Sequence, residues 1–473
     1  MPLILPGNVA SAIGGGYEVA NSCRFDRGSS AYMHKTPGSS GSQTTWTISA
    51  WVKRANEHGT NSYILDCGAG NGTSLYFGPA QIEFWDYQSG YTGRLTTNAV
   101  YRDHSAWYHI VAVWDTTNGT AGDRMKLYVN GTEVTSFATD TNPSSSQASI
   151  LNSTTKITVG SQGTSIYANL YMAEVCFIDG QALTPSSFGE FNEDSPQIWQ
   201  PKDVSELTFG TNGFYCDFED SANLGNDANS GTDLTEVNLA ATDQATDTPT
   251  NNFATWNPLA DYYYAGSYAE GNCQTTTGSS EYGYLPATIG VSSGLWYCEI
   301  EWDAKSGGGG AGGIGITSTQ STASNIQLGG NANDYKWYGP DGKVYNNNDG
   351  DTITAQNTYT TGDIVGIYLD LDNNKLYFSK NGTLENSGTG ISITDPASTP
   401  LGFYFFAIDY ASGSYTGTFK ANFGGCPAFA ISSGNTDANG YGNFEYDPSS
   451  GTFDSASKDF LALCTKNLGS DGG

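Results

Sequence analysis

Three carboxylates alternate along one apolar strand, and their spacing is close to that of a catalytic pair. Glu299, Glu301 and Asp303 occupy every second position of the stretch 295–303, so in a β-strand they share one face with neighbours about 6–7 Å apart. Retaining glycosidases use two carboxylates about 5–5.5 Å apart, one as nucleophile and one as acid. The opposite face is apolar throughout, which favours the alternative that the acids form the solvent side. We therefore predict that the protein is not an enzyme.

An aromatic segment at 82–95 has the residue types of a sugar-binding surface. Sugars are held by rings that stack on their C–H faces and by polar groups that bond their hydroxyls. Because strand alternation would bury some of these rings, the alternative is that they stabilise the sheet by packing across strands. The predicted ligand-binding residues here are Trp85, Asp86, Tyr87, Tyr91 and Arg94.

A second segment, at 334–348, has similar chemistry. Tyr335, Trp337 and Tyr338 are its predicted ligand-binding residues. The Asp341-Gly342 pair that follows is a hairpin turn signal, so the alternative interpretation is purely structural.

Acidic residues cluster at Asp349–Asp351 and at Asp370–Asp372. Their carboxylates are candidate calcium ligands, although neither cluster has the spacing of an EF-hand loop. We predict no cofactor beyond this candidate calcium and no metal site. The eight cysteines have no CxxC spacing, which favours reduced thiols, and the apolar surroundings of Cys176 and Cys298 indicate small core residues.

Short strands joined by polar turns must position these residues. Gly (60) and Tyr (30) are abundant among the 473 residues, and only 14% are charged, a composition typical of all-β proteins with many turns. Segments 106–131 and 361–382 have the same layout, in which an apolar strand ending in Asp is followed by a Lys-Leu-Tyr strand that closes on Asn-Gly. Because Asn-Gly readily adopts positive φ angles, both segments are predicted hairpins. The repetition predicts two β-sandwiches in series with short terminal arms.

The composition also divides the chain into regions. We predict an N-terminal docking arm at 1–20, a sandwich at 21–200, a connector at 201–258, a second sandwich at 259–430 and a C-terminal tail at 431–473. Apolar residues in the arm and tail would need burial by a partner or by the protein's own sandwich. The predicted docking residues are Leu3, Ile4, Leu5, Phe460, Leu461 and Leu463.

The formal charge of −29 disfavours two classes of partner. Such a surface repels nucleic acid phosphates and anionic membranes, so we predict neither as a partner. The apolar start of the chain has no Lys or Arg before Arg24, unlike the basic start of a secretory signal.

Motifs along the chain resemble known families. The first sandwich resembles laminin-G-like, concanavalin A-type domains through Trp46–Trp51, 106–111, 127–131 and 173–184. The second is similar to SPRY domains through 294–300, 312–316, 341–345, 362–366 and 376–382. Both resemblances imply a two-sheet jelly roll, giving an all-β fold of two concanavalin A-like jelly-roll β-sandwiches.

The order of motifs over nearly the whole chain is similar to structural proteins of tailed bacteriophages, especially marine ones. Segments 1–5, 213–218, 241–259 and 460–468 contribute to this similarity. It implies a virion surface protein made in the host cytoplasm, with a tail appendage favoured and the capsid exterior open.

We predict a fibre or appendage that binds host-surface glycans through many weak sites. Its partners would be other virion proteins and further copies of the chain, with a trimer favoured. The alternatives are a head fibre or capsid decoration protein without a ligand and, third, a glycan-degrading enzyme.

Overall fold

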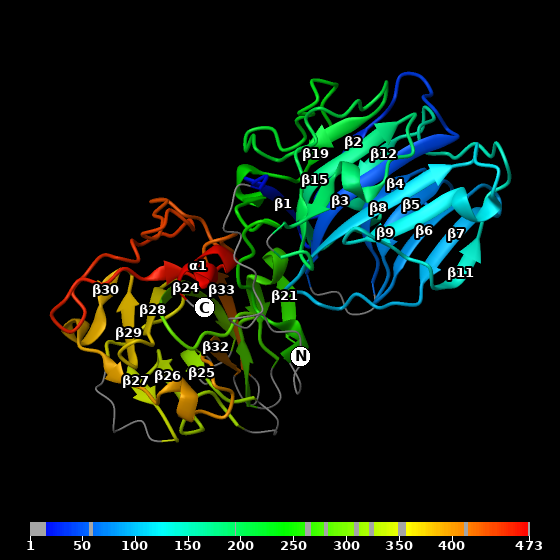
Figure 1. Cartoon of the computed structure of the whole chain (residues 1–473). Helices are drawn as coiled ribbons and strands as arrows, with labels where there is room; N and C mark the ends of the chain where they lie inside the picture. Colours follow the sequence, from blue (N-terminus) through cyan, green and yellow to red (C-terminus); the bar gives the residue numbers. More distant parts are fainter. Residues whose placement is uncertain are drawn as a thin grey trace. The chain divides into compact units, whose positions relative to one another are not determined.

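The computed structural model describes residues 16–55, 60–193, 195–260, 266–278, 282–306, 312–320, 326–348, 356–410 and 415–471. The chain forms two compact units, Gly14–Thr250 and Asn251–Gly473 (Figure 1). Each is a β-sandwich, so the predicted all-β fold is confirmed. Within the described ranges α1 (Thr465–Asp471) is the one α-helix, and no helix there has the length and apolar character to cross a bilayer.

The first sheet of the N-terminal unit has the order β10-β9-β8-β3-β15-β1-β20, with β18 also paired to β15. Its long central strands β3 and β15 are buried along almost their whole length. The strands are β1 (Ser22–Phe25), β3 (Thr45–Arg54), β8 (Trp107–Asp115), β9 (Met125–Val129), β10 (Thr132–Glu133), β15 (Leu170–Asp179), β18 (Phe214–Cys216) and β20 (Gln244–Ala245).

The second sheet has the order β11-β7-β6-β5-β4-β12-β2-β19, and these strands lie side by side in Figure 1. Between the two sheets Trp46 stacks on Trp114 with ring centroids 5.9 Å apart. The strands are β2 (Tyr32–Lys35), β4 (Ser62–Cys67), β5 (Thr73–Phe77), β6 (Ile82–Tyr87), β7 (Tyr91–Thr97), β11 (Phe137–Thr141), β12 (Ile157–Val159) and β19 (Thr235–Val237).

Short elements complete this unit. Pro185 begins a single 3-10 turn, and the side chain of Thr184 before it makes no capping hydrogen bond. The elements are hairpin β13 (Ser161–Gln162) with β14 (Ile166–Tyr167), hairpin β16 (Gly189–Phe191) with β17 (Trp199–Pro201), and the 3-10 turns Ala121–Asp123, Pro185–Ser187 and Ala241–Asp243.

The C-terminal unit pairs a large sheet with a smaller one. The large sheet has the order β21-β22-β33-β24-β28-β29-β30, with β31 on β29 and β34 parallel to β24. Its strands are β21 (Ser267–Ala269), β22 (Gln274–Thr276), β24 (Leu295–Ser306), β28 (Ile364–Asp370), β29 (Lys375–Lys380), β30 (Thr383–Leu384), β31 (Ile391–Ser392), β33 (Thr416–Asn422) and β34 (Leu461–Ala462).

The smaller sheet has the order β23-β32-β25-β26-β27 and faces the large one across a core that contains Trp296, Trp302 and Trp337. Its strands are β23 (Gly283–Pro286), β25 (Gly313–Thr317), β26 (Asp334–Tyr338), β27 (Lys343–Tyr345) and β32 (Phe405–Tyr410), and the 3-10 turns of the unit are Pro258–Ala260, Glu270–Asn272, Glu385–Gly388 and Pro396–Ser398.

The two predicted hairpins are confirmed as β8–β9 and β28–β29. In both, the Asn-Gly pair forms the next tight turn, with positive φ at Asn130 and Gly131 and at Asn381 and Gly382. These turns lead into β10 and β30, as the preference of Asn-Gly for positive φ predicts.

The region predicted as a connector is instead part of the first sandwich. β18 pairs with β15, β19 with β2 and β20 with β1. The boundary between the units therefore lies at Thr250 rather than at 200 and 258. The strands of this region are two or three residues long, too short to produce a periodic pattern in a sequence rich in Asp, Asn and Thr.

The C-terminal tail is also built into its sandwich. Phe460, Leu461 and Leu463 are buried, and β34 within this patch pairs with β24. This corrects their predicted role as docking residues, because the protein's own sandwich covers them. Leu3, Ile4 and Leu5 lie outside the described residues. We call residues 431–471 the C-terminal cover.

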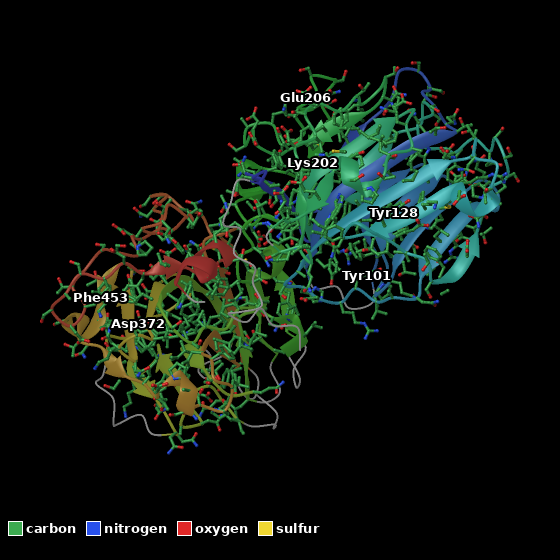
Figure 2. The ribbon with its side chains drawn as sticks, in the orientation of Figure 1. Tyr101, Tyr128, Lys202, Glu206, Asp372 and Phe453 are labelled. Carbon is green, nitrogen blue, oxygen red and sulfur yellow. The ribbon has the colours of Figure 1, made fainter. Side chains whose placement is uncertain are left out.

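The C-terminal cover completes an aromatic layer outside the large sheet. Tyr368 and Tyr377 point away from the core and pack against Phe460 and against Phe453, which is labelled in Figure 2. Tyr297 of the same layer packs against Phe444. We expect Phe460→Ala to lower the free energy of unfolding of this unit by about 3–5 kcal/mol, because it leaves a cavity in a closed layer. Chemical denaturation followed by aromatic fluorescence measures this change.

Phe191→Ala is the matched control, since that ring is 48% exposed. It should leave the transition of the C-terminal unit unchanged. A Phe460→Ala protein as stable as the parent would show that the cover contributes nothing to this unit.

Candidate functional site

Glu299 lies beneath the C-terminal cover, fully buried. Its Oε1 accepts hydrogen bonds from Tyr297 Oη at 3.0 Å and the Tyr446 amide at 2.7 Å. Its Oε2 accepts from Asn422 Nδ2 at 2.9 Å and the Glu445 amide at 3.1 Å. Glu299 is therefore an anchor for the cover and not a residue of a solvent-facing strand side, as the alternation had suggested.

The other two carboxylates of this strand have different surroundings. Asp303 forms an ion pair with Lys420 at 2.7 Å. Glu301 is partly buried, which raises its pKa. Since Glu299 is enclosed by four donors, the three acids do not face one open substrate site.

The predicted ligand-binding residues of segment 82–95 fall into two groups, one buried and one that reaches solvent. Trp85 is 6% exposed and meets Tyr76 and Tyr91 edge-on, with centroids 6.4 and 6.1 Å apart. Asp86 is fully buried, and its carboxylate accepts from Thr73 Oγ1 at 2.6 Å and the Ile150 amide at 2.9 Å. Trp85 therefore packs across strands and Asp86 holds a loop in place.

The remaining three residues of this segment reach solvent. Tyr91 is 47% exposed, and the Arg94 guanidinium lies 4.7 Å from the centre of its ring. Arg94 also bonds Glu83 at 2.8 Å. Tyr87, half-buried, lies 5.2 Å from Tyr91. One face of Tyr91 is thus already occupied by an internal cation.

In the second segment, alternation places two of the three residues in the core. Tyr335 and Trp337 belong to the core of the C-terminal unit, with exposures of 5% and 0%. Tyr338 points to the other face, 6.1 Å from Tyr345. The structure therefore does not bring these three residues together as a surface.

Neither acidic cluster provides a calcium site in the described residues. Asp370 is buried and forms an ion pair with Lys458 at 2.6 Å, and Asp349–Asp351 lie outside the described residues. Where the chain is described, no three His, Cys, Asp or Glu side chains are grouped to hold a metal ion. All eight cysteines are buried, and Cys176 and Cys298 lie in hydrophobic clusters, as predicted.

A buried Ser–His pair in the N-terminal unit is also structural. His109 Nε2 lies 2.8 Å from Ser49 Oγ, and Trp199 Nε1 donates to His109 Nδ1 at 2.9 Å. Indole nitrogen is a donor only, so Nδ1 is the acceptor and Nε2 carries the hydrogen towards Ser49. Burial lowers the pKa of His109 to about 3. The imidazole cannot accept the serine proton in this arrangement.

The N-terminal unit contains a cavity of about 760 Å³ that the sequence did not predict. We call it the polar pocket. Its wall consists almost entirely of hydroxyl, amide and glycine residues together with one His, one Lys and one Asp. The lining residues are His34, Lys35, Thr36, Pro37, Gly38, Ser39, Gly210, Thr211, Asn212, Gly213, Asn229, Ser230, Gly231, Thr232, Asp233 and Thr235.

Buried polar side chains hold the three loops of this pocket together. Asn212 donates through Nδ2 to the Ser39 carbonyl at 2.9 Å, which joins two of the loops. Asp227, 2% exposed, accepts from the Tyr215 and Asn229 amides at 3.0 and 3.2 Å and lies 3.5 Å from Lys35 Nζ. The wall is therefore organised before any ligand binds.

Two side chains give the polar pocket its chemistry. The Asp233 carboxylate is exposed, and hydrogen bonds from the Asp227 amide and Asn223 hold its pKa below the usual value. It is therefore a charged acceptor for hydroxyl groups. Burial and Lys156 lower the pKa of His34, which leaves a neutral flat ring in the wall. A typical site for apolar ligands has a mostly apolar lining, which this pocket lacks.

Sequence reasoning missed this pocket because two of its three loops lie in the region interpreted as a connector. The stretch 226–233, Asn-Asp-Ala-Asn-Ser-Gly-Thr-Asp, was a signal. Such a concentration of Asn, Asp, Ser and Gly indicates a turn whose polar side chains bond the backbone.

Comparisons with known proteins agree with this architecture. Residues 27–186 match Laminin_G_3, described as the concanavalin A-like lectin/glucanases superfamily, and residues 295–419 match the SPRY domain. The Ran-binding proteins 9/10 homolog of Drosophila melanogaster is 34% identical over 94 residues, which are 20% of this chain and 10% of the fly protein. The chain thus matches about a tenth of the length of that relative.

Two solved structures match parts of the chain. The SPRY domain of human HERC1 is 17% identical with a TM-score of 0.29, over 37% of this chain and 99% of that one. A heptameric SAP-like pentraxin from Limulus polyphemus is 15% identical with a TM-score of 0.26, over 36% and 80% of the two chains.

The fold and the family matches define an all-β protein with two sandwich domains. It contains a laminin G-type, concanavalin A-like domain followed by a SPRY domain. The loops 210–213 and 229–235 of the polar pocket and the whole C-terminal cover lie outside the two matched ranges.

The pKa of the Glu299 carboxyl can be tested through the pH dependence of the stability of its domain. Burial raises its pKa from 4.5 to about 7 in spite of four donors. The folded domain therefore holds a proton that the unfolded chain releases, so this contribution to stability is full below pH 4.5 and is lost as the pH rises through about 7. We expect it to amount to at most about 3 kcal/mol.

Glu299→Gln cannot titrate, so the difference in unfolding free energy between the two proteins should change over this pH range. Urea denaturation of the SPRY domain at a series of pH values measures it. Glu206→Gln, at an exposed residue labelled in Figure 2, is the control and should keep the parental pH dependence. Parallel pH profiles for the parent and Glu299→Gln would contradict the raised pKa.

Proposed function

We propose that the concanavalin-type domain binds saccharides in the polar pocket. The observation that supports this is the lining itself: a cavity of about 760 Å³ walled by hydroxyls, amides, one charged carboxylate, one lysine and one neutral imidazole. Sugar hydroxyls both donate and accept hydrogen bonds, so they can satisfy such a wall, whereas an apolar ligand would leave its polar groups unpaired. The match to a lectin and glucanase superfamily supports the same ligand class.

We further propose that the protein works at the surface of a phage particle as a fibre or appendage that contacts host glycans. The resemblance of its motif order to phage structural proteins supports this role. Repeated copies, in trimers or along one particle, would bind through many weak contacts at once, and this avidity would attach the particle firmly. The role that we propose is non-catalytic, and two observations support this: Glu299 is a buried anchor, and His109 cannot act as a base towards Ser49.

Asp233→Asn tests the proposed site. The substitution removes the charge and keeps the shape, so we expect the Kd for a bound saccharide to rise about tenfold, as for the loss of a charge-assisted hydrogen bond. An array of microbial polysaccharides identifies the ligand, and calorimetry with that ligand measures both proteins.

Asp220→Asn is the matched control, since it alters an exposed aspartate that does not line the polar pocket. Unchanged unfolding midpoints would show that both variants are folded. An Asp233→Asn protein that binds like the parent, or a parent that binds no saccharide on the array, would contradict the proposal.

A further inference from the structure

Strand β2 presents two rings on the outer face of its sheet. Met33 is buried in the core, so its neighbours Tyr32 and His34 point the other way. The ring centroids of Tyr32 and His34 lie 5.9 Å apart, and the ring of Tyr167, from hairpin β13–β14, lies 6.0 Å from that of Tyr32. Lys156 Nζ lies 5.9 Å from the Tyr32 ring. Three rings thus form a continuous row.

Each end of this row opens into a cavity. His34 lines the polar pocket, and Tyr167 lines a second cavity of about 410 Å³, which we call the hairpin pocket. Arg27 shapes the hairpin pocket by donating to the Tyr167 and Asn61 carbonyls at 2.8 and 2.7 Å. Its lining residues are Arg27, Thr60, Asn61, Ser165, Ile166 and Tyr167.

The two pockets are too far apart for one sugar ring. Hairpin β13–β14 packs over β4, and the polar pocket lies at β2 and β19. Pairing through β12 places Lys35 of the polar pocket level with Cys67, so Asn61 of the hairpin pocket lies six residues, or about 20 Å, away along the strand direction. Figure 1 shows β2, β12 and β4 side by side. A ligand that contacts both pockets must therefore be extended.

We propose that the ligand is a saccharide chain of several units, which lies along the row from the polar pocket to the hairpin pocket. This inference rests on the proposed function and specifies its ligand class. One end bonds Asp233, the middle crosses His34 and Lys156, and the other end stacks on Tyr167. Tyr32 is 7% exposed, so it supports the row from below. An apolar peptide would not satisfy the hydroxyl and amide groups of the polar pocket.

The Tyr167→Ala substitution distinguishes the contributions of the two pockets to saccharide binding. The probes are size-graded fragments, from monosaccharide to hexasaccharide, of the polysaccharide that binds on the array. We expect the affinity of the parent to rise with fragment length. In Tyr167→Ala the longest fragment should bind about three- to tenfold more weakly, the value of one aromatic contact, while the shortest fragment binds as before.

Two further variants complete the design. Lys156→Ala should weaken the longer fragments without affecting the shortest one, because Lys156 lies over the middle of the row. Tyr128→Ala is the control: this tyrosine, labelled in Figure 2, belongs to β9 in the other sheet and should change nothing.

The outcomes distinguish this inference from the proposed function. Equal affinity of short and long fragments, or equal weakening of all fragments by Tyr167→Ala, would overturn the extended chain and leave saccharide binding intact. Failure of every fragment and polysaccharide to bind the parent would overturn both.

Discussion

Large aromatic side chains on the outward face of a jelly-roll sheet need a second layer of protein, and both domains depend on how that layer is built. Strand alternation buries one set of side chains in the core and turns the next set away. In the SPRY domain the outward set includes Tyr297, Tyr368 and Tyr377. The C-terminal cover supplies Phe453 and Phe460 to close over them, so water is excluded from both faces of this part of the sheet.

Closing a sheet in this way creates a requirement for polar partners. Once covered, Glu299 can no longer bond water, and a buried carboxyl without donors would be costly. Four donors from β24, β33 and the cover satisfy it. Asp437 does the same inside the cover, accepting from the Ala462 amide and Asn467 Nδ2 at 2.8 and 2.7 Å. These contacts fix the path of a segment that has little regular secondary structure.

In the concanavalin-type domain the outward face of the sheet is covered only in part. On one side of hairpin β13–β14, Tyr63 stacks on Tyr76 and Tyr76 meets Trp85 edge-on, so the three rings shield one another. On the other side the face ends in loops rather than in a layer. The polar pocket and the hairpin pocket lie there, with Tyr32 and His34 between them. Incomplete covering thus leaves one domain with a polar surface that can receive a ligand.

The sequence by itself determined the elements. Alternation identified the longer strands, Asn-Gly identified the tight turns at 130–131 and 381–382, and local motifs identified the two domain types in their correct order. These signals depend on residues close together in the chain, so they can be recognised without a structure. The residues predicted to bind sugar were less well determined, because a period of two shows which side chains share a face and not what covers that face.

Tertiary structure decided the burial of each face and the location of the pockets. From the sequence, Trp85 and Trp337 were predicted to bind a ligand and Glu299 to face solvent. In the structure, distant segments enclose all three side chains. The polar pocket joins residues 34–39 to 210–213 and 229–235, which are brought together when β19 pairs with β2 and β18 with β15. Such pairing depends on strands too short to detect in the sequence, and only the folded domain places their loops around one cavity.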